Sequence, residues 1–500
     1  MIWTTVFILG LITVIWRLWR YKNKHLLDIA RKIPGPPALP GLGNALLFMC
    51  QPEEFVRVIG DLIRVYGDVL GVWLGPNYNI VLTNPDDLKI LLSNPKTSFK
   101  GPQYQFMAEI IGSGILSGSG PTWRKHRKIA TPNYGKKAIE SYSNIFNNEV
   151  DLLLQRYRKK TGQIFDIYED IVQTTSYCVC RTLMGLTKEE TMNLPHLQDI
   201  IAETPKIYDL VFDRITKWYL QVYAVFRLSK NYGTQKNFTT KIKIFSKTVL
   251  QHRQEHMKTL EVENKIDLMT SEDDNVKNTQ LSVIDRFILS KELDGEELLN
   301  ETFTIFTSSQ EASAKITSFL LLMMAFHPDC QDKLYYEIKT VIGDEDRPVT
   351  NEDLKQMPYL DMAFKEVLRL FPIGAMLQRS IHEDMALSTS ILPGGSSVVI
   401  PIYHLHRDPR FWDNPDDFDP ERFNPENINK RHPYCYIPFS LGSMDCLGRY
   451  FGTKLIKTIC VRVLREFKIT TMQSYEDLKV AIAISTVAID GYPAKLTRRI

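Results

Sequence analysis

The sequence predicts a mainly α-helical fold with a small β-sheet subdomain. Two stretches alternate in polarity around turn residues: "DVLGVWL" and "YNIVLT" flank Gly75-Pro76, and "MALSTSILPGGSSVVIPIY" fills residues 385–403. Each predicts a pair of strands. Elsewhere apolar residues recur at the three-to-four spacing of amphipathic helices, in four long stretches: 138–158, 196–227, 298–326 and 328–342.

The whole chain has the composition of one large globular domain. Its 500 residues are 44% hydrophobic and 24% charged, with no internal repeat. The net charge of +3 is too small and scattered to predict nucleic-acid binding. Seven cysteines without Cys-x-x-Cys spacing indicate a reducing compartment rather than a zinc site. The most polar stretch, 262–278, predicts a solvated loop between helices.

The amino end predicts a membrane anchor. Residues 2–16 are apolar and uncharged, and Arg17 can extend the run by reaching toward the headgroups. Basic residues follow at once, so the positive-inside rule leaves the body in the cytoplasm. We expect a transmembrane signal anchor at 1–20, a basic and proline-rich linker at 21–48 and a globular domain at 49–500. A cleaved signal peptide is the alternative, although no cleavage site supports it.

One cysteine stands in an unusual frame, "PFSLGSMDCLGRYFG". Gly442 and Gly448 bracket Cys446, and a helical pattern begins just after it. Backbone amides and a helix amino end both stabilise a thiolate, and Phe439 is placed to shield it from water. A lone cysteine before a helix is, however, ordinarily structural.

The surrounding segment, "RHPYCYIPFSLGSMDCLG", resembles the haem-binding loop of cytochrome P-450 enzymes. Its pattern is matched by Phe439, Gly442, Cys446 and Gly448. The surrounding sequence is similar to that of animal microsomal fatty-acid omega-hydroxylases and their insect relatives. The resemblance implies the cytochrome P-450 fold for 49–500, haem b as the cofactor, and the Cys446 thiolate as the axial iron ligand.

Three further motifs occur in the family's order. In "KEVLR", Glu366 and Arg369 lie on one helix face, and with Arg422 of "FDPERF" they resemble the family's buried Glu-Arg-Arg brace. By the same resemblance, three residues are implied to bind the haem propionates: Trp123, Arg127 and Arg379. A surface ion pair and a solvated basic helix are the ordinary alternatives for these motifs.

The sequence departs from the family pattern twice. Met444 stands where the loop usually has an arginine that binds a propionate, which predicts weaker haem retention. In the distal helix, "SSQEAS" at 308–313 aligns with Ala-Gly-x-Asp-Thr-Thr, so Ala312 replaces the threonine that helps deliver protons to oxygen. We expect Glu311 and Ser313 to serve in catalysis, with Ser309 or a water as substitutes, and no covalent haem link at Ser308.

The resemblance implies a monooxygenase that inserts one atom of O2 into a lipophilic substrate with NADPH-derived electrons. Its partners would be NADPH–cytochrome reductase, with a small cytochrome b as an optional donor, in the endoplasmic reticulum membrane. The alternatives are a haem-thiolate isomerase or dehydratase, and a non-catalytic haem or ligand-binding protein. We expect a basic docking face at Arg124, Lys128, Lys430, Arg431, Arg449, Lys454 and Lys457. We expect apolar pocket walls at Phe106, Met107, Ile110, Ile111, Ile115, Leu210, Val211, Phe212, Phe371, Ile373 and Met376.

Overall fold

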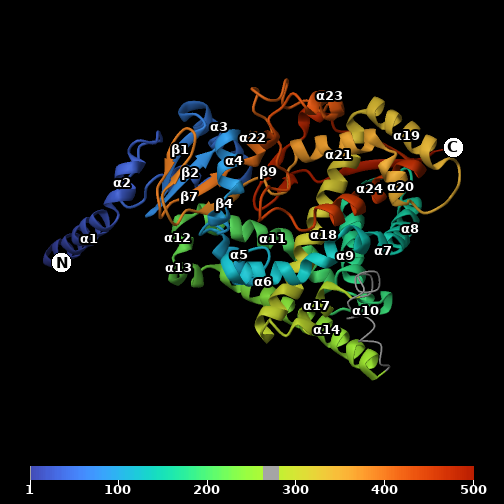
Figure 1. The fold of residues 1–500 in the computed structure, drawn as a ribbon, viewed down its shortest axis with the longest axis horizontal. Coiled ribbons are helices and arrows are strands. Elements are labelled where there is room, and N and C mark those ends of the chain that lie inside the picture. The colour runs from blue at the N-terminus through green and yellow to red at the C-terminus, as the bar shows by residue number, and fades with distance from the viewer. Residues whose placement is uncertain (1, 263–280, 500) are drawn as a thin grey trace.

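The computed structural model describes residues 2–262 and 281–499, and helices dominate it (Figure 1). The helices are α1 (Ile2–Lys22), α2 (Lys24–Ala30), α3 (Pro52–Tyr66), α4 (Pro85–Ser93), α5 (Tyr104–Ile111), α6 (Gly120–Ala130), α7 (Lys136–Ser141), α8 (Ser143–Lys159), α9 (Tyr168–Thr182), α10 (Lys188–Met192), α11 (Leu197–Thr216), α12 (Trp218–Gln221), α13 (Tyr223–Arg227), α14 (Lys230–Val262), α17 (Val283–Ser290), α18 (Gly295–Phe326), α19 (Pro328–Ile342), α20 (Asn351–Lys355), α21 (Pro358–Leu370), α22 (Ile402–Leu405), α23 (Pro425–Ile428) and α24 (Arg449–Glu466). The mainly helical prediction is confirmed.

The long helical predictions differ from the structure chiefly at their ends. The stretch 138–158 is divided at Tyr142 between α7 and α8, and 196–227 comprises α11 followed by the short α12 and α13. The last two stretches are α18 and α19, as predicted. The predicted polar loop at 262–278 starts at the end of α14, and its remainder lies outside the described residues.

The strands form one four-stranded sheet and three smaller ones, from β1 (Val69–Leu74), β2 (Asn77–Leu82), β3 (Ile164–Asp166), β4 (Leu377–Ser380), β5 (Met385–Ala386), β6 (Ile391–Leu392), β7 (Ser397–Ile400), β8 (Phe467–Thr470), β9 (Val480–Ile482), β10 (Thr486–Ala488) and β11 (Pro493–Arg498). The predicted β1–β2 hairpin is confirmed, with Leu74 opposite Asn77 at the turn. The second predicted pair is only partly right. β5 pairs with β6, whereas β7 joins β2 and β4 in the large sheet, where Val398 and Ile400 are fully buried.

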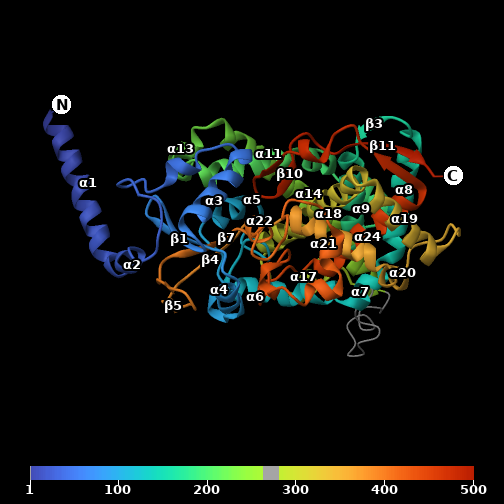
Figure 2. The ribbon, with the colours of Figure 1, turned by 90° about the horizontal axis from the view of Figure 1, so that it is seen from above.

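The N-terminal helix projects from one end of the molecule, opposite the C terminus (Figures 1 and 2). Across residues 2–262 and 281–499, no helix combines the length and apolar character that crossing a membrane requires. The proline-rich segment after α2 lies against the sheet. The Gly71 N–H donates to the Pro34 carbonyl at 2.8 Å, and the Asn44 side-chain amide donates to the Pro37 carbonyl at 2.9 Å. Leu26 and Ile33 are buried in the apolar cluster beneath the sheet.

Helix α18 runs through the centre of the main hydrophobic core. Asp294 caps its amino end by accepting from the Glu297 N–H, and Glu297 returns the bond in a capping box. Downstream of Gln310 its side chains are almost all buried, and Phe319 stacks on Phe371 with ring centroids 4.2 Å apart. The helix therefore forms a rigid wall against which α9 and α24 pack.

Candidate active site

The segment before α24 forms a tight loop that presents Cys446. The Cys446 N–H donates to the Phe439 carbonyl at 2.8 Å, which closes the loop on itself. Gly442 has φ +81°, and a Cβ there would overlap the Leu92 carbonyl at the end of α4. Glycine is therefore required at 442 by backbone conformation and by the close approach of α4.

A Gly442→Ala change should destabilise this loop more than its backbone conformation alone explains. Alanine at positive φ costs about 1–2 kcal/mol, and the overlap with Leu92 adds to that cost. Gly343→Ala is a matched control, because Gly343 has φ +75° but open space around its Cβ position. Denaturant unfolding of both variants measures the difference; equal losses would show that α4 does not constrain the loop.

Cys446 is exposed although protein surrounds it. The residue has accessible surface, yet burial raises the pKa of its thiol, and we infer that it borders a recess of the protein rather than its outer surface; we call this recess the cavity. The Gly448 N–H hydrogen-bonds the sulfur and opposes that rise, as do the charges of Arg449 and Arg127. The predicted amide support for a thiolate is therefore present at Gly448. Phe439 contributes its carbonyl to the loop, while the Arg449 guanidinium lies 5.5 Å from its ring.

Helix α6 fastens the cysteine loop. Arg127 donates to the Asp445 carbonyl at 2.6 Å and also pairs with the Asp445 carboxylate. Trp123 is buried, and its ring lies 5.5 Å from the Arg127 guanidinium. In this structure Arg127 thus contacts the residue beside Cys446, a contact that the sequence did not predict.

Two more cations border the cavity. Arg379 is buried and donates to the Gln378 carbonyl, and its guanidinium also hydrogen-bonds the Tyr104 hydroxyl. Lys100 and Arg379 form an isolated antiparallel β-bridge, and Lys100 Nζ lies 4.8 Å from the Tyr104 ring. Within 2–262 and 281–499, no carboxylate forms an ion pair with Lys100 or Arg379. Lys100 was missed in the sequence because "SFKGP" contains no motif; only the fold brings it to Arg379.

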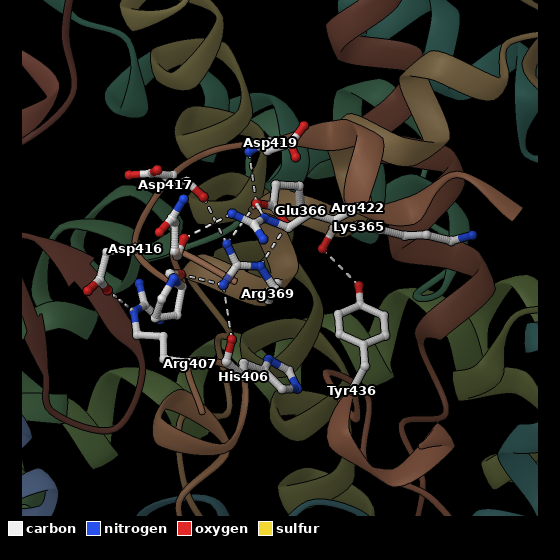
Figure 3. Close-up of polar contacts among 12 residues, drawn as sticks. Lys365, Glu366, Arg369, His406, Arg407, Asp416, Asp417, Asp419, Arg422 and Tyr436 are labelled. Carbon is white, nitrogen blue, oxygen red and sulfur yellow. Dashed lines mark hydrogen bonds and ion pairs between the residues drawn. The ribbon is translucent and has the colours of Figure 1, made fainter. Parts of the chain in front are cut away.

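The predicted Glu-Arg-Arg brace is confirmed (Figure 3). Glu366 and Arg369 form two hydrogen bonds of 2.7 Å and are completely buried. Arg422 Nε lies 3.3 Å from Glu366 Oε1, which also accepts the Asp419 N–H at 3.0 Å. Arg369 donates to the carbonyls of His406, Pro415 and Asp417. The brace therefore joins α21 to the segment that leads into the cysteine loop.

A stripe of α18 faces the cavity. Ser308, Ser309 and Ala312 are half-buried, whereas the helical residues around them are buried. The Ser309 and Tyr134 hydroxyls lie within reach of each other, and the charge of Cys446 raises the pKa of Tyr134, so Tyr134 lies near both α18 and the sulfur.

Glu311 and Ser313 point elsewhere. Glu311 Oε1 lies 2.6 Å from Lys315 Nζ, and Lys315 donates to the Ser485 hydroxyl at 2.6 Å. Ser313 is buried, and its hydroxyl lies beside Gly452 of α24. The structure places neither side chain on the stripe, and their catalytic roles stay predictions.

Comparisons with known proteins agree with this geometry. Residues 33–489 match the family model of cytochrome P450. The chain belongs to the cytochrome P450 family. It is 30% identical to cytochrome P450 4c3 of Drosophila melanogaster over 99% of this chain and 94% of that protein. It is also 30% identical to human cytochrome P450 4V2, over 92% and 89%, and 27% identical to cytochrome P450 4c21 of Blattella germanica, over 92% and 91%.

Cytochromes P450 bind haem b through a cysteine thiolate, and the residues of this P450 fit that group. Cys446 is an exposed cysteine at the inferred cavity. Lys100 and Arg379 are cations without acidic partners among the described residues, which suits the two propionates of the porphyrin. Met444 is buried and adds no charge.

A Met444→Arg change should slow haem loss from this P450. One more charge-assisted hydrogen bond to a propionate contributes about 1.5–3 kcal/mol to haem binding, which corresponds to a rate of haem loss that is roughly tenfold slower or more. Transfer of haem to an excess of an apo-globin measures the rate, with Met444→Leu as the control for the change of shape. A Met444→Arg protein that loses haem as fast as wild type would contradict the predicted effect of this departure.

The contribution of Lys100 to haem affinity should fall as the pH rises above about 7. Burial, together with the charges of Arg379 and Arg127, lowers the pKa of Lys100 to about 7. Propionates favour the charged lysine, so the haem-bound protein holds a proton there that the free protein loses above that pH, and this contribution declines by up to about tenfold per pH unit. Ligation of the Cys446 thiolate acts in the opposite direction, because burial raises the pKa of the free thiol and haem binding displaces its proton. Haem titrations of wild type and Lys100→Gln between about pH 6 and 9 separate the two effects; the ratio of wild-type to variant affinity should fall with pH, and a constant ratio would exclude Lys100 as the source.

The predicted basic docking face is wrong at Lys454 and Lys457. Lys454 is buried and donates to the Ile139 carbonyl at 2.9 Å, and Lys457 is buried and pairs with Asp361 at 2.6 Å. Arg431 is half-buried over the Trp412 ring, at 4.3 Å. Lys454 and Lys457 failed as surface candidates because the face of α24 that they share turns toward the core. Arg124, Lys128 and Lys430 are exposed.

Proposed function

We propose that this P450 inserts one oxygen atom of O2 into a lipophilic substrate, using electrons derived from NADPH. The observation that carries the proposal is the exposure of Cys446 together with the half-buried α18 stripe in an otherwise buried region. Tyr134 lies near both, and the charges of Arg379 and Cys446 act on Lys100. This arrangement suits a thiolate-ligated porphyrin.

Haem b bound at this site supplies the oxygen-activating chemistry. The chain's own residues position it. The Gly448 N–H and the start of α24 stabilise negative charge on the Cys446 sulfur. Lys100 and Arg379 would hold the propionates, and Arg127 keeps the loop in place through Asp445. The buried walls around α18 exclude water from the reacting substrate.

The electron partner in this proposal is NADPH–cytochrome reductase, with a small cytochrome b as an optional donor, at the endoplasmic reticulum membrane. Exposed apolar side chains of α1 support membrane attachment: Phe7, Val14, Ile15 and Leu18. Arg17, Arg20, Lys22 and Lys24 would keep the catalytic domain on the cytoplasmic side. Arg124 and Lys128, on the helix that fastens the cysteine loop, are placed to meet an acidic flavoprotein.

The proposed substrate class is lipophilic: a fatty acid, a lipid-derived signal or a foreign compound. Of the predicted pocket walls, Ile115, Ile373 and Met376 are half-buried, whereas Phe106, Val211 and Phe371 fill the core. An apolar lining of this kind binds substrate mainly by removing its surface from water.

Two measurements test the proposal together. Reduced protein under carbon monoxide should show the red-shifted Soret band of thiolate ligation, and NADPH with reductase should be consumed faster when lipids are added. A protein with the band but without consumption would refute the monooxygenase proposal.

One observation favours a second candidate. Ala312 offers no hydroxyl on the cavity stripe, and a haem-thiolate isomerase or dehydratase needs no proton delivery to O2. Conversion of a lipid hydroperoxide or an oxime without NADPH or O2 would support that candidate over the monooxygenase.

A further inference from the structure

A buried histidine–glutamate pair joins α6 to α18 beside the cavity. His126 Nδ1 lies 2.7 Å from Glu301 Oε1, and both side chains are 1% exposed. The same carboxylate oxygen accepts the Ile115 N–H at 2.7 Å. The backbone of Gly114 lies so close that a Cβ there would overlap it. Glu301 Oε1 is thus fully used, and the orientation of the carboxylate is fixed.

The remaining polar atoms of the pair have no hydrogen-bond partner among the described residues. These are Glu301 Oε2 and His126 Nε2, both buried. Leaving such atoms unpaired costs about 1–3 kcal/mol each. A purely structural role for the His126–Glu301 pair therefore does not explain why these two atoms are unpaired. Nε2 faces Glu297, whose carboxylate is 3.8 Å away, 31% exposed and 3.3 Å from Lys125 Nζ. The histidine therefore adjoins a group that exchanges protons with solvent.

Tyr134 and Ser309 continue from the pair toward the cavity. Burial raises the pKa of Tyr134, and the charges of Cys446 and Glu301 raise it further, so its hydroxyl stays protonated. A protonated hydroxyl relays a proton by accepting one and donating another. Its partner Ser309 is on the cavity stripe, one helical turn from Ala312.

We propose that His126 and Glu301 form the proton inlet of the catalytic cavity, with Tyr134 and Ser309 as the final relay. This inference rests on the proposed function. The balanced reaction, RH + O2 + NADPH + H⁺ → ROH + H2O + NADP⁺, passes two electrons through the reductase, and two protons must enter the cavity. The path requires a water between Glu301 Oε2 and the Tyr134 hydroxyl, which would also be the hydrogen-bond partner of that carboxylate oxygen.

The other polar groups near the cavity are committed to different contacts. The Ser308 hydroxyl donates to the Thr304 carbonyl at 2.6 Å. Glu311 is held by Lys315, and Ala312 has no proton to give. Ser309 is thus the hydroxyl of the stripe that a relay can use.

The test compares Glu301→Gln, which keeps an oxygen acceptor for His126 but carries no acidic proton, with wild type. We expect product formation with NADPH and reductase to fall on the order of 10²-fold. We also expect a larger share of the electrons to appear in hydrogen peroxide, and a larger solvent deuterium isotope effect. Ser309→Ala, a small change in a helix, should show the same pattern if Glu301→Gln folds poorly. Glu149→Gln is the matched control, since Glu149 is also buried but pairs with Arg181.

A second readout needs no turnover. When carbon monoxide is photolysed from the reduced haem protein, infrared difference spectra should show a carboxyl band that shifts in D2O and is absent from Glu301→Gln. If the band is present but wild type consumes no NADPH, the proposed function fails while the inlet stands. If Glu301→Gln and Ser309→Ala match wild type in isotope effect, peroxide yield and spectrum, the inlet is refuted.

Discussion

A Cys446→Ser protein should lose the red-shifted Soret band of its reduced, carbon monoxide-bound form and all monooxygenase turnover. A serine hydroxyl does not ionise under these conditions, so it cannot supply the electron density of a thiolate to iron. The substitution is nearly isosteric, and Cys446 opens onto a cavity rather than into the packed core. The loop should therefore keep its shape while its chemistry is lost.

Cys435 provides the control for that experiment. It lies in the same segment, but it is buried, and burial raises the pKa of its thiol to about 11. A Cys435→Ser protein should retain the band. A Cys446→Ser protein whose spectrum and turnover equal those of wild type would refute both thiolate ligation by Cys446 and the proposed function.

The second large effect is expected from Glu366→Ala. This change strands the Arg369 guanidinium without a counter-charge in a completely buried position, and it removes the acceptor of the Asp419 N–H. Breaking a buried pair from one side costs about 3–5 kcal/mol. Because the brace holds the segment that precedes the cysteine loop, haem content should fall along with stability.

Glu421→Ala is the matched control for that change. Glu421 is in the same "PERF" turn as Arg422, and it pairs with Lys333 at the surface, where 46% of its side chain is exposed. Exposed pairs contribute about 0–1 kcal/mol. Denaturant unfolding and haem absorbance measure both variants. Similar losses of stability and haem content in the two would show that the buried brace stabilises the protein no more than an exposed ion pair does.

The cysteine loop and the Glu366–Arg369 pair of the brace could be predicted from the sequence because the residues that form each of them are close together in the chain. Gly442 and Cys446 stand a few residues apart, and Glu366 and Arg369 occupy one face of one helix turn. Charges of opposite sign at such spacing pair wherever the helix is placed.

The parts that the sequence did not predict depend on distant contacts. Lys100 reaches the site through a bridge to Arg379, far along the chain. Lys454 and Lys457 resemble surface cations in sequence, and only the packing of α24 buries them. Likewise, β7 leaves its neighbour in sequence for the larger sheet, because burial on both faces outweighs the short local turn.

The attachment of the proline-rich segment to β1 has a consequence for how the molecule meets a membrane. Trp19, still within α1, makes an edge contact with the β1 residue Trp73 at 5.8 Å, and His25 lies 2.6 Å from Asp384. Because the Gly71 N–H is hydrogen-bonded to the Pro34 carbonyl, few residues between α1 and the catalytic body are left to act as a flexible linker. Any lipid surface that holds α1 would therefore also set the tilt and height of the catalytic body, and inserting flexible residues near Asn23 would free its orientation.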